Sequence, residues 1–253
     1  ESFQPETKTL GIAISLSGDG TTLAVADMSF ARVYNLRNGI WEKVGQDVLG
    51  DSTRDVDLSE DGRTLAVRFG STSYTRVYSL DENDEKWVQL GDGIETDAPF
   101  GFESIDLSAD GKTIAIADPK NDDVASNAGS VTVHRLDSSS GNWIRLGPGV
   151  GSPNLLQGDS EDDQFGSCVS ISADGNRIAA GARESVDEPG LVRVLDWTGE
   201  EWIRVSLDII GNEGEGAGFY CSMAGSRMAL GFPAFNTYTG YARVMELEEL
   251  KST

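Results

Sequence analysis

The stretch S-I-D-L-S-A-D-G-K-T-I-A-I-A-D, from Ser104 to Asp118, decides the fold. Its two halves each alternate apolar and polar residues, and alternation at period two is typical of strands with unlike faces. Asp110-Gly111 lies between the halves and predicts a tight turn, because Gly adopts positive φ without strain and Asp bonds its own backbone. The stretch therefore predicts a β-hairpin.

The same hairpin pattern occurs five times along the chain. The gaps between successive turn glycines are 42, 49, 64 and 50 residues, so the variation in length must lie in loops. The last copy is one residue short at its turn. The copies are Ile12–Asp27, Asp55–Phe69, Ser104–Asp118, Cys168–Ala182 and Tyr220–Phe232, with turn glycines Gly20, Gly62, Gly111, Gly175 and Gly225.

Each copy continues into a third strand of the form R-V-Y or similar, and four copies add a fourth strand that opens with Trp41, Trp87, Trp143 or Trp202. A four-stranded unit repeated at this spacing is typical of a propeller blade. We therefore predict an all-β fold, a β-propeller of five blades with four antiparallel strands each, forming a single domain over 1–253. The blades are about 1–50, 51–97, 98–158, 159–212 and 213–253.

The fifth copy lacks a Trp strand. The N-terminal segment Glu1–Gln4 is expected to supply part of the missing outer strand and so close the ring, which removes two exposed sheet edges. The alternative is that the chain is a piece of a longer protein with more blades.

The charge is strongly negative, with 42 acidic and 20 basic residues and a net charge of −22. Such a surface repels phosphate backbones and anionic lipid, so nucleic-acid binding is not expected. It suits a soluble coat in salty or calcium-containing surroundings, and we expect an extracellular or organelle-lumen location; recruitment of cations or of a basic partner is the alternative. No run of 18 apolar residues is present, which predicts no membrane-spanning helix.

Cys168 and Cys221 lie near equivalent points on the first strands of copies four and five. The alignment offsets them by one residue, so their side chains are expected to face opposite ways. Two free, partly buried thiols are therefore expected, and a disulfide between neighbouring blades is the alternative.

The segment D-Q-F-G-S-C-V-S-I-S-A-D-G-N-R-I-A-A-G-A, Asp163–Ala182, resembles an FG-GAP repeat. Phe165-Gly166 matches the opening of that pattern, as does Phe100-Gly101 in copy three, and the resemblance extends over nearly the whole chain. It implies a propeller fold and a surface for binding or adhesion. The family's calcium loops read D-x-D-x-D-G, whereas four of the turns here carry one Asp and the fifth, A-G-S, carries none, which is too few oxygen donors for Ca²⁺.

Two groups of residues are candidate metal sites. The first strands carry one polar residue each between their apolar pairs, and Asp57 and Asp106 among them could hold water or a cation; a solvated channel wall is the alternative. The second group is the acidic loop that contains Asp118, Asn121, Asp122 and Asp123. Its oxygen donors could bind Ca²⁺, the one cofactor considered, and a solvated surface loop is the alternative. Calcium binding and simple solvation are likewise the two alternatives for Asp159, Glu161, Asp162 and Asp163. The polar residues of the first strands are Ser15, Asp57, Asp106, Ser170 and Ser222.

Other recurrent residues are interpreted as structural. His134, the single histidine, replaces a Tyr of the third-strand pattern and is expected to be a packed or surface strand residue. The four Trp residues are expected to pack between blades, although an exposed one could stack on a sugar. The recurring Arg residues suggest pairing with an acid of a neighbouring blade; they are Arg32, Arg76, Arg193 and Arg243.

No nucleophile elbow, metal-binding histidine pair or phosphate loop occurs, and no catalytic residue is assigned. We therefore predict a non-enzymatic propeller that presents loops to a protein partner, as a scaffold or extrinsic subunit. A glycan-binding module is the second hypothesis, and a hydrolase or lyase with a channel-bound metal is the third. The aromatic platforms of the second hypothesis would be Phe30, Tyr74, Phe235 and Tyr238.

Overall fold

The computed structural model describes residues 9–71, 74–95, 104–147, 156–183, 189–212, 214–233 and 239–247. These residues form strands and turns and no helix, so the all-β prediction is confirmed. Accordingly, the described part of the chain contains no helix long and apolar enough to cross a membrane.

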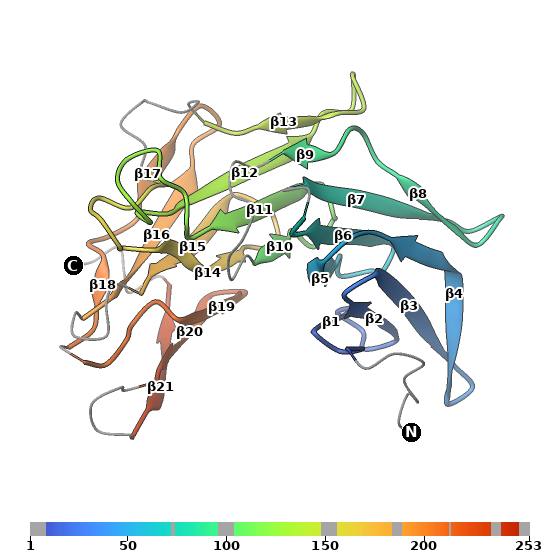
Figure 1. The fold of residues 1–253 in the computed structure, drawn as a ribbon, viewed down its shortest axis with the longest axis horizontal. Coiled ribbons are helices and arrows are strands. Elements are labelled where there is room, and N and C mark those ends of the chain that lie inside the picture. The colour runs from blue at the N-terminus through green and yellow to red at the C-terminus, as the bar shows by residue number, and fades with distance from the viewer. Residues whose placement is uncertain are drawn as a thin grey trace. The chain divides into compact units, whose positions relative to one another are not determined.

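The strands form five antiparallel sheets, each built in chain order (Figure 1). The first sheet contains β1 (Ala13–Leu16), β2 (Thr22–Asp27), β3 (Phe30–Arg37) and β4 (Ile40–Leu49). The second contains β5 (Thr53–Leu58), β6 (Thr64–Phe69), β7 (Tyr74–Asp81), β8 (Lys86–Gln89) and β9 (Ile94–Glu95). The third contains β10 (Ile105–Leu107), β11 (Thr113–Asp118), β12 (Ser130–Leu136) and β13 (Trp143–Arg145). The fourth contains β14 (Phe165–Ile171), β15 (Arg177–Ala182), β16 (Leu191–Trp197), β17 (Trp202–Arg204) and β18 (Ile209–Ile210), and the fifth contains β19 (Tyr220–Ala224), β20 (Arg227–Phe232) and β21 (Tyr241–Glu246).

The predicted repeat is present in these sheets. Each of the five hairpins pairs as expected, and the third strand and the Trp strand follow in the first four sheets. The short strands β9 and β18, which pair with β7 and β16, were not predicted. A closed ring is not found among the described residues, and Glu1–Gln4, expected to close it, lie outside them.

The chain divides into two compact units. One comprises Glu1–Phe100 with the short segments Ala109–Gly111 and Leu136–Trp143. The other comprises Gly101–Ser108, Lys112–Arg135 and Ile144–Thr253.

The residues of each S-x-D-G turn form hydrogen bonds with one another, so the same motif can form the turn in each hairpin. In the second sheet the Ser59 hydroxyl donates to Asp61 Oδ1 at 2.7 Å and accepts the Thr64 N–H at 2.9 Å. The fourth sheet repeats this with Ser172 and Asp174, and the hydrogen bond from Ser172 lowers the pKa of the Asp174 carboxyl. Because the Asp oxygens also accept a backbone N–H within the turn, these carboxylates are used for turn geometry.

Two separate constraints require glycine at position 175. Gly175 has φ +69°, a conformation that side chains with a Cβ adopt at a cost. A Cβ at this position would also lie 2.6 Å from the Thr113 hydroxyl of the preceding sheet. The turn therefore sets both the hairpin bend and the spacing between two sheets.

The core lies between successive sheets. Each sheet has an aliphatic face, bearing the large residues of its first strand, and a small-residue face, bearing Ala and Val of its second and third strands. In the first unit, Ala31 and Val33 on the small-residue face of the first sheet pack with Val56 and Leu58 on the aliphatic face of the second. In the second unit, the small-residue faces of the third and fourth sheets pack in the same way on the aliphatic faces of the fourth and fifth.

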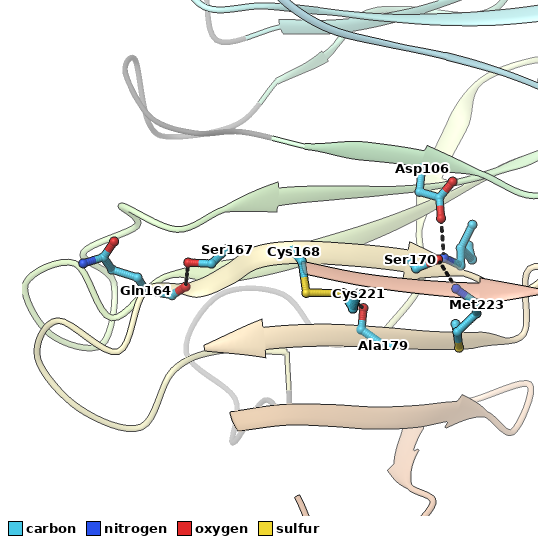
Figure 2. The surroundings of a disulfide bond; sticks show 9 residues. Asp106, Gln164, Ser167, Cys168, Ser170, Ala179, Cys221 and Met223 are labelled. Atoms are coloured by element: carbon cyan, nitrogen blue, oxygen red, sulfur yellow. Dashed lines mark hydrogen bonds between the residues drawn. A yellow bond between two sulfur atoms is a disulfide. The ribbon is translucent and has the colours of Figure 1, made fainter. Parts of the chain in front are cut away.

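The expectation of two free thiols is wrong, because Cys168 and Cys221 form a disulfide (Figure 2). The one-residue offset between them is real: Ser170 pairs with Ala179 and Ser222 with Ala229, which makes Tyr220 the equivalent of Cys168. Cys168 thus lies on the small-residue face of the fourth sheet and Cys221 on the aliphatic face of the fifth. These two faces pack on each other, so side chains that point to opposite sides of their own sheets meet.

Candidate functional site

Polar residues of the first strands form hydrogen bonds to the first strand of the next sheet. In the first unit, Ser15 Oγ accepts the Leu58 N–H at 3.0 Å and donates to Asp57 Oδ1 at 2.7 Å. In the second unit, Asp106 Oδ2 accepts the Ile171 N–H at 2.7 Å. Ser170 Oγ accepts the Met223 N–H at 3.0 Å (Figure 2). In each case the accepted N–H belongs to the residue after the equivalent position of the next sheet, so this row is a ladder of sheet-to-sheet hydrogen bonds.

The predicted cation site between Asp57 and Asp106 stays a prediction. Asp57 belongs to the first unit and Asp106 to the second. Within the part of the chain that the structure describes, no group of three or more His, Cys, Asp or Glu side chains is arranged to hold a metal ion.

The first acidic loop, between β11 and β12, uses its carboxylates to fold itself. Asp118 is buried and its Oδ1 accepts the Lys120 N–H at 3.3 Å. Asp122 Oδ1 accepts the Asn127 N–H at 2.7 Å, and Asp123 Oδ2 accepts from Asn121 Nδ2 at 3.3 Å. These three residues, predicted as calcium ligands, therefore act as turn acceptors, and calcium binding here also stays a prediction.

The structure brings the two predicted acidic loops together, which the sequence did not indicate. The segment 126–129 pairs through backbone hydrogen bonds with the segment 158–165: Asp162 N–H donates to Ser126 O, and Phe165 N–H to Ala128 O, both at 2.9 Å. Asn127 Nδ2 adds a bond to Asp162 Oδ1 at 2.8 Å. We call this pair the interlocked acidic loops. Its exposed carboxylates are Asp122, Asp123, Asp159, Glu161 and Asp162.

A buried arginine anchors the second of these loops. Arg193 on β16 has a side chain only 2% exposed, and its guanidinium contacts Asp208 at 3.0 Å and Asp159 at 2.8 Å. It also donates to Gln157 O at 3.1 Å and lies over the Phe165 ring. A buried guanidinium needs such partners, because an unpaired charge in the interior is strongly unfavourable.

The acids that pair with Arg32 and Arg193 belong to the same repeat as the arginine, not to a neighbouring repeat as suggested. Arg32 pairs with Asp47 at 2.7 Å on the adjacent strand of the first sheet, and this bond lowers the pKa of Asp47 to about 2. Arg193 pairs with Asp208, which follows it in the fourth repeat. Arg76 lies over the Phe69 ring, and Arg243 is exposed.

Three of the four recurring tryptophans connect neighbouring repeats, as predicted, and for Trp41 the expectation stays a prediction. The Trp87 indole donates to Val44 O at 3.2 Å and the Trp143 indole to Leu90 O at 2.9 Å, both within the first unit. In the second unit the Trp202 indole donates to Leu146 O at 3.3 Å. Each acceptor is the fourth residue of the preceding W-x-x-[VL] motif, so the bond repeats with the sequence.

Of the four aromatic residues suggested as sugar-stacking platforms, two lie among the described residues. Phe30 is half-buried under the Arg32 guanidinium, 4.8 Å from its ring centre. Tyr74 is half-buried on β7. Phe235 and Tyr238 lie outside the described residues.

His134 is a packed strand residue, as expected, and its environment predicts a pH effect. Burial, with a smaller contribution from Arg145, lowers the pKa of His134 to about 4, and its Nδ1 atom is buried without a hydrogen-bond partner. The unfolded chain binds this proton near pH 6.5 and the folded chain does not, so stability falls as the pH drops from 6.5 towards 4. We expect a loss of about 2 kcal/mol at pH 5 relative to pH 7.

Chemical denaturation of the wild type and of His134→Tyr at the two pH values measures this loss. Tyr is a suitable replacement because it occupies the equivalent positions Tyr34 and Tyr78. The variant should lack most of the pH 5 loss, because it has no histidine to protonate. Equal pH dependence of the two proteins would contradict the assignment.

The chain is similar in fold to three solved structures. Hydrazine synthase of Kuenenia stuttgartiensis matches 95% of this chain and 67% of its own, with a TM-score of 0.60 and 17% identity. A candidate 6-phosphogluconolactonase from Bacteroides uniformis matches 81% of this chain and 55% of its own, with a TM-score of 0.56 and 15% identity. A candidate TolB from Agrobacterium tumefaciens matches 96% of this chain and 79% of its own, with a TM-score of 0.56 and 15% identity.

No protein-family model and no curated protein matches the sequence, so the resemblance to FG-GAP repeats stays a prediction. At 15–17% identity the likeness to solved structures extends to the fold alone. The chain is thus an all-β protein of antiparallel sheets, similar in fold to propeller-like proteins.

Proposed function

We propose that the five sheets are successive blades of a propeller, and that the protein is a non-enzymatic scaffold or extrinsic subunit that presents its loops to a protein partner. Two of the similar structures carry the names of enzymes, but a fold shared at this identity does not imply a shared reaction. The disulfide is in keeping with an extracellular or lumenal location, where disulfides persist.

The interlocked acidic loops are the observation that supports this proposal best. The polar positions that repeat are used for contacts inside the protein: turns, sheet-to-sheet ladders and Trp bonds. The loops between β11 and β12 and before β14 do not repeat, yet backbone hydrogen bonds and the buried Arg193 hold them in one conformation. A surface that is ordered before binding loses less conformational entropy when a partner docks.

The charge of these loops indicates the kind of partner. Asp122, Asp123, Glu161 and Asp162 are exposed, and the chain as a whole carries a net charge of −22. A protein with a basic patch would be attracted over a distance comparable to the Debye length, and its association would weaken with added salt.

Affinity purification from the native source tests the proposal. Wild-type protein should retain a partner in stoichiometric amount, and Asp122→Asn/Glu161→Gln should retain roughly ten-fold less at low salt. Asn at 122 keeps the oxygen that accepts the Asn127 N–H, so the loop fold is preserved. The matched control is Glu200→Gln/Glu201→Gln, which removes two exposed charges from the turn between β16 and β17.

The control variant should behave as the wild type. Absence of any stoichiometric partner would contradict the scaffold function. Equal loss of the partner in both variants would show that total charge matters and that these loops are not the docking surface. Retention of glycans in place of a protein would favour the lectin hypothesis.

A further inference from the structure

The turn between β3 and β4 holds the single Asn-Gly step of the sequence, Asn38-Gly39. Arg37 pairs with Ile40, so these two residues alone form the loop, and both have positive φ, +53° and +80°. These features match a type I′ turn, for which Asn-Gly is a preferred pair. The turn joins two strands of one sheet within the first unit.

An Asn that precedes Gly can lose its side-chain amide without an enzyme. The backbone nitrogen of the Gly attacks Cγ of the Asn, a C–N bond forms and ammonia leaves, which gives a succinimide ring. Water then opens the ring at either carbonyl and produces aspartate or isoaspartate, so water is the only co-reactant. A Cβ on the following residue hinders the attack, and Gly has none. Every other Asn of the sequence precedes a residue with a Cβ.

The surroundings of Asn38-Gly39 leave this step unprotected. Both residues are exposed, and a Cβ added at Gly39 would meet no atom within 4 Å. Among the described residues, neither the Asn38 side chain nor the Gly39 N–H has a hydrogen-bond partner. The glycines of the S-x-D-G turns differ, as at Gly175, whose N–H donates to Ser172 O at 2.8 Å. The nitrogen that would attack is therefore bonded in the S-x-D-G turn and available at Gly39.

We propose that Asn38 is a site of spontaneous deamidation in the folded protein, at a rate set by opening of the turn. In a type I′ turn the backbone nitrogen of the second turn residue points away from the side chain of the first, so the turn must open before the attack. Aspartate would add a negative charge next to Arg37, which pairs with Glu85 at 3.1 Å. Isoaspartate would lengthen the main chain by a methylene, and the register of β3 and β4 depends on the length of this turn. The modification is independent of the partner suggested for the acidic loops.

Peptide mapping of purified protein incubated in mildly alkaline buffer tests the site. Trypsin releases Asn38–Lys43 as one peptide, in which mass spectrometry detects the change from amide to carboxylate and electron-transfer fragmentation separates isoaspartate from aspartate. Asn83 is the internal control, because it is exposed at the tip of the β7–β8 hairpin and precedes Asp84. Asn38 should deamidate roughly ten-fold faster than Asn83 in the same sample. Its rate should rise with pH, because base deprotonates the attacking N–H.

Two variants and an unfolded sample complete the test. Gly39→Ser adds a Cβ beside the attacking nitrogen and should slow deamidation of Asn38 to the rate of Asn83. Asp84→Gly places a glycine after Asn83 and should make Asn83 as labile as Asn38, and this variant decides alone if circular dichroism shows that Gly39→Ser is unfolded. Urea should raise the rate at Asn38, because the turn no longer holds the nitrogen away. Equal rates at Asn38 and Asn83 in the folded wild type would overturn the proposal, as would an Asn38 that loses its amide only in urea.

Discussion

Replacing Cys168 and Cys221 together by alanine is expected to lower the free energy of unfolding of the second unit by about 4 kcal/mol. The disulfide closes a loop with a sequence separation of 53 residues, and a cross-link of that length removes much of the conformational entropy of the unfolded chain. Among the described residues the fifth sheet has three strands and the fourth has five, so the fifth sheet depends on this bond more than the fourth does.

Chemical denaturation followed by hydrogen exchange measures both the size and the place of the effect. Exchange should increase in β19–β21 and stay unchanged in β1–β3, which belong to the other unit. Reduction of the wild type should reproduce the loss, and reduction of the double variant should add nothing. A double variant as stable as the oxidised wild type would show that packing alone holds the fifth sheet.

Arg193→Met is expected to cost about 3–5 kcal/mol, because it removes a buried guanidinium with its hydrogen bonds and leaves the Asp208 carboxylate with only the more exposed Arg204, at 3.4 Å, as a counter-charge. Asp208 is 11% exposed and lies 3.0 Å from the Arg193 guanidinium. Gln157 O would lose its hydrogen bond at the same time, and the loop before β14 would lose its anchor. Urea denaturation of the variant and the wild type gives the difference in free energy.

Two further variants separate charge from packing. Arg177→Met removes an ion pair with Asp196 that joins β15 to β16 nearer the surface, where the two side chains are 20% and 30% exposed, and should cost only about 1 kcal/mol. Arg193→Met/Asp208→Leu removes both buried charges and should recover part of the stability lost in the single variant. If the double variant were no more stable than Arg193→Met, the loss would come from packing and not from the Asp208 carboxylate that has lost its nearer counter-charge.

The repeat could be predicted from the sequence because its signals are local. Alternation at period two places the strands, and the S-x-D-G turn satisfies its own polar groups within a few residues, so both are visible in a short stretch. The Trp bonds follow the same spacing, since donor and acceptor belong to the same motif in successive copies.

The disulfide and the Arg193 network could not be predicted in the same way, because they depend on which faces of two sheets meet. An offset of one residue places Cys168 and Cys221 on opposite faces of their own sheets, which suggested free thiols; only the packing of these two faces on each other brings the two sulfur atoms together. Similarly, Arg193 has the same strand position as Arg76 and Arg243, yet only the loop that carries Asp159 and the residue Asp208 make it a buried anchor. The pairing of the acidic loops depends on backbone contacts that composition does not encode.

The closed set of hydrogen bonds in each S-x-D-G turn has a consequence for the order of folding. Ser59, Asp61 and Thr64 satisfy one another without help from any other sheet, so a hairpin can form its turn before its neighbours are in place. Contacts between residues close in the chain form fast. We expect the hairpins to form independently and to pack on one another in a later step. A long loop inserted between two hairpins should therefore slow their packing and leave the rate of hairpin formation unaltered.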